Sequence, residues 1–342
     1  MQSSPYVLGR VHLPVIMLKV LLALVPAIAV YVWLFGPAIL ISLSLASLGA
    51  LALEALALKL RNRPVTTGLL DGSALVTAWL LALSIPSIAP WWLTLVGVFF
   101  AIVVAKHLYG GLGNNIFNPA MVGYAVLIVS FPVPMTQWAA PLSLASQSLN
   151  LTDAIGYIFS NHLPDNWHLD AISSATPLDT LRTQLKLHHT VASIRSMPTF
   201  GHFGGTGSEY IALAYLAGGL YLLAERIITW QVPLAIIASL AAISGMFWLA
   251  DPAVWASPMF HLAAGGTMLG AFFIATDPVT STTTPRGKLF FGAGIGVLIW
   301  LIREFGAYPD GVAFAVLLMN ITVPLIDSWT QPPPYGHKET AS

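Results

Sequence analysis

The sequence predicts an all-α, polytopic membrane protein whose ten transmembrane helices form two inverted five-helix repeats. Composition is the first reason, because 56% of the 342 residues are hydrophobic and only 8% are charged, against about 25% charged in soluble proteins. The second reason is that long apolar runs recur along the whole chain, each near the roughly 20 residues that cross a bilayer. The third is a likeness between the two halves of the chain.

Five apolar runs lie on either side of one long polar interval. Those before it are residues 15–35, 37–58, 68–86, 91–108 and 119–134, and those after it are 209–227, 231–250, 258–276, 289–305 and 309–327. We therefore expect a first membrane repeat over 1–135, an extracytoplasmic region over 136–208 and a second membrane repeat over 209–342. No cleavage site follows the first run, so its helix is expected to remain as an anchor.

The fifth helix of each half begins with a similar sequence. Pro119-Ala-Met-Val-Gly-Tyr-Ala-Val-Leu and Pro309-Asp-Gly-Val-Ala-Phe-Ala-Val-Leu are identical at five of nine positions. Because an odd number of spans separates equivalent points, the second half is expected to be inverted in the membrane. Inverted repeats place functional sites near their interface. Chance similarity between apolar helices is the alternative interpretation.

Basic residues predict the orientation, because cytoplasmic loops carry an excess of Lys and Arg. With both termini cytoplasmic, the basic residues of the short loops and the tails all fall on the cytoplasmic side; they are Arg10, Lys59, Arg61, Arg63, Lys106, Arg226, Arg286, Lys288 and Lys338. The short outer loops 84–90 and 251–257 then contain no Lys or Arg. The polar interval lies outside the cytoplasm on this interpretation.

Composition also limits the chemistry of the chain. It has no cysteine, which excludes disulfides, catalytic thiols and iron–sulfur clusters held by its own cysteines. A redox role would need an organic cofactor and a partner that supplies electrons. The net charge is zero and no basic cluster carries aromatic residues, so nucleic-acid binding is not expected. The nine histidines show no metal-ligand spacing.

The stretch Asp170-Ala-Ile-Ser-Ser-Ala-Thr-Pro-Leu-Asp179 is the main candidate site. The hydroxyl of Thr176 can form a phosphate ester, and Pro177 suits the first position of a helix. Thr176 would then be the N-cap, where a phosphate meets free N–H groups and the positive end of the helix dipole. The alternative is an ordinary helix start, with Asp179 completing a weak capping box.

Three further polar features lie in the apolar runs or in the loops next to them. Residues 110–119, with Asn115 and Asn118, form an amide- and glycine-rich loop that either lines a small-molecule or ion site or only caps the next helix. Asp71 and Asp277 are candidates for ion or proton handling, and otherwise caps.

Two features of the second half are not expected to bind a ligand. Arg303 and the adjacent Glu304 are expected to reach the membrane surface and to pair locally. Thr267 superficially resembles a second attachment site, but it lies in an apolar helix, where glycines more simply allow close packing.

Residues 170–176 are similar to the flavin-transfer motif Asp-x-x-(Ser/Thr)-Gly-Ala-Thr, with Ser174 in place of glycine. Together with residues 110–120, 268–280 and 308–317, this motif resembles the family of the D subunit of the Rnf electron-transport complex and the B subunit of the sodium-translocating NADH:quinone reductase. The resemblance covers essentially the whole chain.

The resemblance implies a bacterial inner-membrane subunit that carries electrons between ferredoxin and NAD while ions are translocated. FMN would be attached to Thr176 by a periplasmic flavin transferase that recognises Asp170, Ser173, Ser174 and Ala175. A non-covalent riboflavin would lie near Asn115 and Asn118. Partners would be the other subunits of the complex, including iron–sulfur and FMN-carrying ones. The competing class is a solute or ion channel or transporter without redox function.

Overall fold

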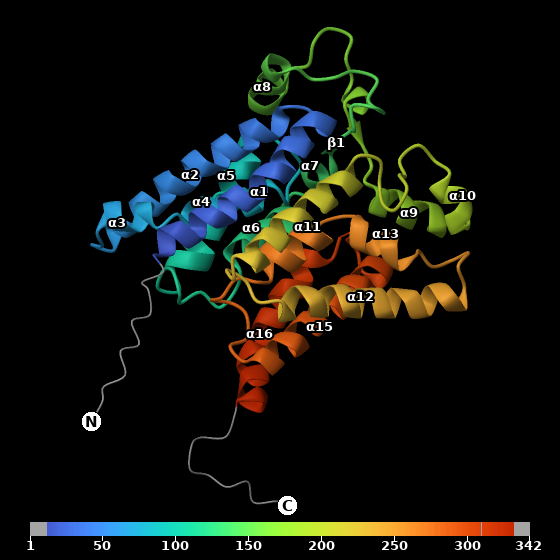
Figure 1. The fold of residues 1–342 in the computed structure, drawn as a ribbon. Coiled ribbons are helices and arrows are strands. Elements are labelled where there is room, and N and C mark those ends of the chain that lie inside the picture. The colour runs from blue at the N-terminus through green and yellow to red at the C-terminus, as the bar shows by residue number, and fades with distance from the viewer. Residues whose placement is uncertain (1–11, 309, 332–342) are drawn as a thin grey trace, which may run out of the picture.

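The computed structural model describes residues 12–308 and 310–331, which are mostly helical. The expected cytoplasmic tails, with Arg10 and Lys338, lie outside these residues. Figure 1 shows the helices of the two halves packed together, with the segments between residues 138 and 207 gathered at one end.

Most of the first five expected spans are present as helices. These are α1 (Leu13–Phe35), α2 (Ala38–Leu60), α5 (Trp91–Phe99) continued by the π-helix η1 (Phe100–His107), and α6 (Pro119–Ser130). Gly36 ends α1 with a φ of 90°, a conformation that glycine adopts without a steric penalty. The third span is interrupted, because α3 (Val65–Leu70) and α4 (Ser73–Ala82) are separated by Asp71 and Gly72.

The second half repeats this arrangement. Its uninterrupted helices are α11 (Ser208–Ala224), α12 (Gln231–Ala250), α15 (Pro285–Phe305) and α16 (Val312–Thr330). The eighth span is divided into α13 (Pro258–Ala263), α14 (Thr267–Leu269) and the π-helix η3 (Gly270–Ile274). The third span of each half is therefore broken, a feature that the internal likeness alone did not indicate.

The prediction of continuous helices over 68–86 and 258–276 is wrong for a local reason. Gly72 has a φ of 77° and Gly265 a φ of 63°, so the backbone turns out of the helix where only glycine is unstrained. The N–H groups freed by these turns are bound by carboxylates, Asp71 accepting from Ser73 N and Asp310 from Gly266 N. Irregular backbone at membrane depth is tolerated when it is satisfied inside the protein in this way.

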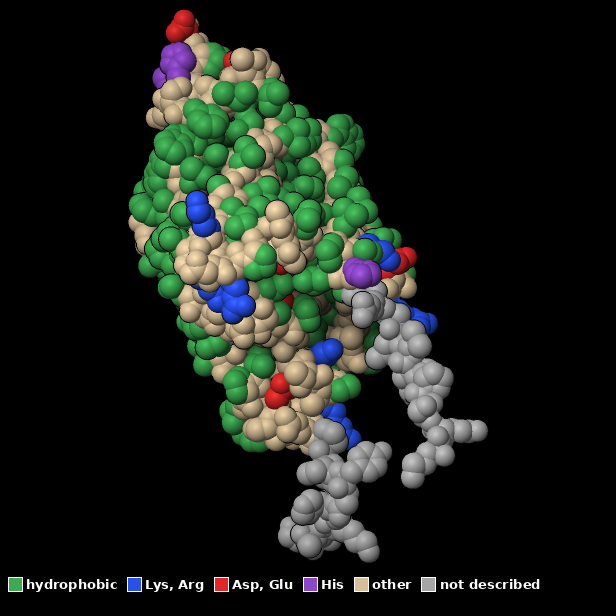
Figure 2. Space-filling view, turned by 90° about the vertical axis from the view of Figure 1, so that its left-hand side faces the viewer, with side chains coloured by type: hydrophobic (Ala, Val, Ile, Leu, Met, Phe, Trp, Pro, Cys, Tyr) green, Lys and Arg blue, Asp and Glu red, His purple; other side chains and the backbone are tan. Residues whose placement is uncertain are grey.

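The described residues form a multi-pass membrane protein. Four helices, α1, α2, α12 and α16, are long and apolar enough to cross a bilayer, and four shorter apolar helical segments accompany them: Ser73–Ala82, Trp91–His107, Pro119–Ser130 and Ser208–Ala224. Figure 2 shows a broad hydrophobic surface, with Lys and Arg side chains in its middle and lower parts in this view. The count of ten crossings and the inverted repeat remain predictions.

The region between the two halves packs against both of them through two small hydrophobic clusters, one that includes Ala38 and one that includes Phe260. It contains α7 (Pro132–Thr136), β1 (Trp138–Ala139), α8 (Leu151–Ser160), the 3₁₀-helix η2 (Leu169–Ala171), β2 (Ser173–Ser174), α9 (Pro177–Lys186) and α10 (Val191–Arg195). The strands pair antiparallel, Trp138 opposite Ser174 and Ala139 opposite Ser173. This short ribbon departs from the expected all-α class, and it fixes the start of the Thr176 motif.

Candidate functional site

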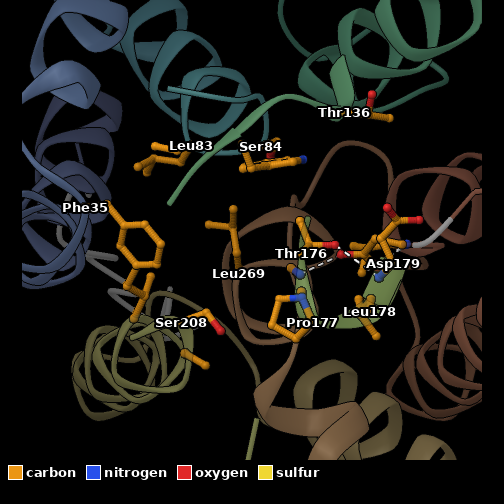
Figure 3. Close-up of a pocket in the computed structure, with 18 of the residues that line it drawn as sticks. Phe35, Leu83, Ser84, Thr136, Thr176, Pro177, Leu178, Asp179, Ser208 and Leu269 are labelled. Atoms are coloured by element: carbon orange, nitrogen blue, oxygen red, sulfur yellow. Dashed lines mark hydrogen bonds between the residues drawn. The ribbon is translucent and has the colours of Figure 1, made fainter. Parts of the chain in front are cut away.

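Thr176 is the N-cap of α9, as the sequence predicts. Its backbone is extended, and its Oγ1 accepts a hydrogen bond from Asp179 N at 3.2 Å. Pro177 occupies the first helical position, where its missing N–H costs nothing. Figure 3 shows this turn and its hydrogen bond beside a pocket bordered by Phe35, Ser208 and Leu269.

The rest of the motif leads into this turn along an extended path. Asp170 is exposed in η2, and the Ser173 hydroxyl donates to Leu169 O at 2.9 Å. Ser174 lies in β2, and it is not among the described residues with a positive φ. The position therefore does not require the backbone freedom of glycine. Ala175 is exposed and Thr176 is half-buried, so the end of the motif is accessible from solvent, whereas Ile172 within it is buried.

A cavity of about 200 Å³ opens at Thr176. This is many times the about 10–15 Å³ that one water molecule needs. Apolar side chains, five of them aromatic, dominate its walls, and polar groups interrupt them. The aromatic residues are Tyr31, Phe35, Tyr124, Trp138 and Tyr215, and the polar ones are Ser84, Thr136, Ser174, Thr176, Asp179, Thr199, Thr206, Ser208 and Asp310. Largely apolar walls with a few placed polar groups are typical of sites for planar organic ligands.

The cavity extends from Thr176 to the residues that contact Asn118. Met121 and Ile274 line it. Asn118 Oδ1 accepts from Met121 N at 3.2 Å, and Asn118 Nδ2 donates to Ile274 O at 3.2 Å. Asn115 and Asn118 do not themselves line the cavity, which ends at these contacts of Asn118.

The two asparagines differ in their contacts. Asn118 is the buried N-cap of α6, as predicted, and its backbone N–H donates to Asn320 Oδ1 at 3.1 Å. Both ends of its amide are engaged within the fold. Asn115 is also buried, and its Nδ2 donates to Phe117 O at 3.1 Å. Asn115 is the freer of the two to meet a ligand, since its carbonyl oxygen has no hydrogen bond to the described residues.

Arg303 does not reach the membrane surface, contrary to expectation. It is buried, and its guanidinium donates to His261 O at 2.7 Å, Thr267 Oγ1 at 2.8 Å and Asp310 Oδ1 at 3.1 Å. The five donors of a guanidinium can satisfy several acceptors left by a broken helix. Because Asp310 lines the cavity, this network connects the break in the eighth span to the Thr176 site.

The two candidate ion-handling aspartates are bound within their own turns. Asp71 Oδ1 accepts from Ser73 N at 2.7 Å and from Ser73 Oγ at 2.6 Å. Asp277 accepts from Val279 N and Thr280 Oγ1, each at 3.1 Å. These contacts are those of caps, the alternative interpretation of both residues. Among the described residues no group of side chains is arranged to hold a metal ion.

A buried charged cluster was missed by the sequence interpretation. Lys106 is not in a cytoplasmic loop as predicted, because its Nζ lies in the interior, 2.8 Å from Glu54 Oε1. His107 Nε2 is 3.0 Å from Glu54 Oε2. The signal was available in the sequence, since Glu54 is the single acidic residue in the apolar run 37–58. Charged groups inside a membrane helix indicate function by default.

The fold and the cavity together define a multi-pass membrane protein with an accessible threonine at the mouth of an aromatic-lined site. The chain belongs to the NQR2, RnfD, RnfE family, whose sequence pattern matches residues 1–336. It is 51% identical to the D subunit of the ion-translocating oxidoreductase complex of Escherichia fergusonii, over 98% of each chain. The proteins of the same name from Shigella dysenteriae and Escherichia coli are 52% and 51% identical, again over 98% of each chain. The resemblance inferred from the motifs is confirmed.

Proposed function

We propose that this chain is a membrane subunit of an ion-translocating oxidoreductase complex and carries electrons through FMN esterified to Thr176. One observation carries the proposal. The threonine of the motif stands as an N-cap at the mouth of an aromatic cavity that extends to the contacts of Asn118. The family and the names of the full-length relatives support the assignment to such a complex.

The Thr176 turn suits a phosphate ester. The first turn of α9 has N–H groups without helical partners, and the helix dipole favours an anion there. The exposed Asp170 and Ala175 offer the motif to a flavin transferase from outside. No Lys or Arg of the described residues lines the cavity, so a phosphate would be stabilised by the helix start and by solvent.

The cavity walls suit a flavin ring. When bound, FMN would supply reversible electron uptake; the protein would supply position and dielectric. Tyr31, Tyr124 and Tyr215 form broad aromatic surfaces that exclude water. Riboflavin near Asn115 and Asn118 would extend the electron path toward the far side of the membrane. Ferredoxin and NAD would be the terminal partners, reached through iron–sulfur and FMN-carrying subunits.

Ion coupling would involve polar groups whose protonation or ion occupancy responds to the charge on the cofactors. Asp71 and Asp277 are the candidates from the sequence. A change in the charge of a cofactor shifts the equilibrium between two conformations of the protein only if that charge interacts differently with the two conformations. The interrupted third and eighth spans are where such an arrangement could change.

The test is an absorbance spectrum and an intact mass of the protein produced together with a flavin transferase. A flavin spectrum that persists after denaturation, with a mass increase of one FMN less one water, is expected. A colourless protein of unmodified mass would refute the proposal and favour a solute channel or transporter.

A further inference from the structure

A second polar site lies at the other end of the membrane region, in the first half. Glu54, Lys106 and His107 are 2%, 2% and 6% exposed. Glu54 stands six residues before Leu60, the end of α2, which is about 9 Å along the helix. Lys106 and His107 end η1, which packs against α2. Three ionisable side chains thus meet out of contact with solvent, and the Thr176 cavity does not include them.

Hydrogen bonds assign the proton positions in this cluster. Arg61 NH1 lies 3.1 Å from His107 Nδ1. Because a guanidinium can only donate, Nδ1 must accept, and the single proton of the neutral imidazole is on Nε2. That nitrogen lies 3.0 Å from Glu54 Oε2, within ion-pair distance. Both atoms are buried, and neither has a hydrogen-bond partner among the described residues, so His107 Nε2 is the nearest polar group that could pass a proton to the free carboxylate oxygen.

The cluster reaches solvent through two half-exposed residues. Arg61 stands beside His107 and donates to Gly110 O at 2.8 Å. On the other side, Lys106 Nζ donates to Ser73 Oγ at 2.9 Å, and that hydroxyl donates to Asp71. The chain of contacts therefore runs from Arg61 through three buried ionisable groups to Asp71.

Among the described residues, the ion-pair partners of Glu54 are Lys106 and His107. Lys19 of α1 pairs with Glu225 instead. Asp153 belongs to α8, which packs near Ala38 at the opposite end of α2. Lys106 is thus the counter-ion of Glu54, and His107 is the group through which a proton can arrive.

We propose that Glu54 is a proton-binding site loaded from solvent through His107. When Arg61 moves aside, His107 Nδ1 takes a proton from water, and Nε2 releases its own proton to Glu54 Oε2. The carboxylate becomes a neutral carboxylic acid, the imidazole remains neutral, and one proton has entered from solvent. Lys106 is then a buried cation without a counter-charge, which links proton uptake to a change in the packing of η1 against α2.

The second half holds a matched contact that is built on an arginine. Ser73 begins α4 after the break in the third span and accepts from Lys106. Thr267 begins α14 after the break in the eighth span and accepts from Arg303 at 2.8 Å. Arg303 cannot lose its proton. The two contacts resemble each other in place and differ in the cation, which is a lysine in the first half and an arginine in the second.

The first experiment is infrared spectroscopy of the purified complex over a series of pH values. A carboxylic-acid band that grows as the pH falls is expected in the wild type and should be absent in Glu54→Gln. Because Glu54→Gln leaves Lys106 unpaired, the double variant Glu54→Gln/Lys106→Met is measured as well, since replacing both members of a buried pair is tolerated better than removing one. A band unchanged in both variants would overturn the proposal.

The second experiment measures proton uptake per electron in the complex reconstituted into liposomes. His107→Gln keeps a donor toward Glu54 and an acceptor for Arg61 but cannot pass a proton, so uptake should fall at least about tenfold. Lys19→Met/Glu225→Gln removes an exposed Lys–Glu pair and should change nothing. Wild-type uptake in His107→Gln would show that the cluster is only structural.

Proton binding by Glu54 does not depend on the proposed function. Only the coupling of proton uptake to electron transfer rests on it. The infrared band does not require electron transfer. Failure of flavin attachment with an intact Glu54 band would therefore refute the proposed function alone. A wild-type complex with normal flavin content but without a band that Glu54→Gln removes would refute only the proton site.

Discussion

Thr176 combines two properties in one side chain, a capping oxygen and an esterifiable hydroxyl. Thr176→Ala should abolish the FMN mass increment, whereas Thr176→Ser should keep part of it because the hydroxyl remains. Removing the cap should also cost about 0.5–2 kcal/mol of helix stability. Intact-mass spectrometry of each variant, produced with the transferase, measures the first effect.

Thr190 provides the matched control for this prediction. It caps α10 in the same region, accepting from Ser193 N at 3.3 Å. Thr190→Ala should lose a comparable capping bond and keep the full FMN increment. An increment that disappears in both variants would mean that local folding, rather than the Thr176 hydroxyl, controls attachment.

Ser174 tests whether the motif needs glycine. Because Ser174 lies in an extended strand paired with Trp138, the serine side chain imposes no backbone strain. Ser174→Gly should therefore leave the extent of flavin attachment within about twofold of the wild type, as judged from the ratio of modified to unmodified mass. A large increase would show that the transferase itself selects glycine.

Asn115 and Asn118 are expected to bind riboflavin, with different side effects on stability. Replacing either by Leu should lower acid-extractable riboflavin roughly 5-fold to 150-fold, the equivalent of about 1–3 kcal/mol for unpaired flavin groups. FMN on Thr176 should be unaffected. Asn118→Leu should also destabilise the fold, since its amide joins α6 to the end of η3.

The control for the asparagine prediction is Asn150→Leu. Asn150 caps α8 through Asp153 N at 2.9 Å and lies in the region between the two halves. The Asn150→Leu variant should leave extractable riboflavin at the wild-type level. Wild-type riboflavin in both Asn115→Leu and Asn118→Leu would identify these residues as structural caps.

The interrupted spans are the main elements that hydropathy did not predict. Each break is followed by a hydroxyl residue bound to a buried cation from the next span, Ser73 by Lys106 and Thr267 by Arg303. An inverted repeat would produce such matched contacts at opposite ends of the molecule. The match supports the repeat more specifically than the apolar sequence likeness does.

Thr267 should therefore be important for stability. Thr267→Val keeps the shape but removes an acceptor from buried Arg303 and a donor to His261 O, at a cost of about 1–3 kcal/mol. Thr267→Ser should recover most of the stability that Thr267→Val loses. Thr322→Val is the control, because Thr322 bonds only within its own helix. Thermal unfolding in detergent compares the variants; equal midpoints for Thr267→Val and Thr322→Val would contradict the prediction.

At the scale of the whole molecule, the orientation remains a prediction from the basic loops. Reporter fusions after Arg63 and Arg226 should report cytoplasm, and fusions at His188 should report the outer compartment. A cytoplasmic His188 would place Thr176 out of reach of a periplasmic transferase. Lys106 should not be used as a loop marker, since it is buried.

The sequence by itself determined the membrane class, most helix positions, the family and the caps at Thr176 and Asn118. These follow from signals contained in a few neighbouring residues, such as apolar run length, a proline at a helix start or a short motif. Only the tertiary structure decided that the third and eighth spans break, that Lys106 and Arg303 are buried, and that one cavity connects Thr176 to the contacts of Asn118. The physical reason is that these features depend on partners distant in the chain: Lys106 lies 52 residues from Glu54, and Asn118 lies 156 residues from Ile274. Hydropathy records that a residue is polar or apolar, but packing decides which partner removes it from water.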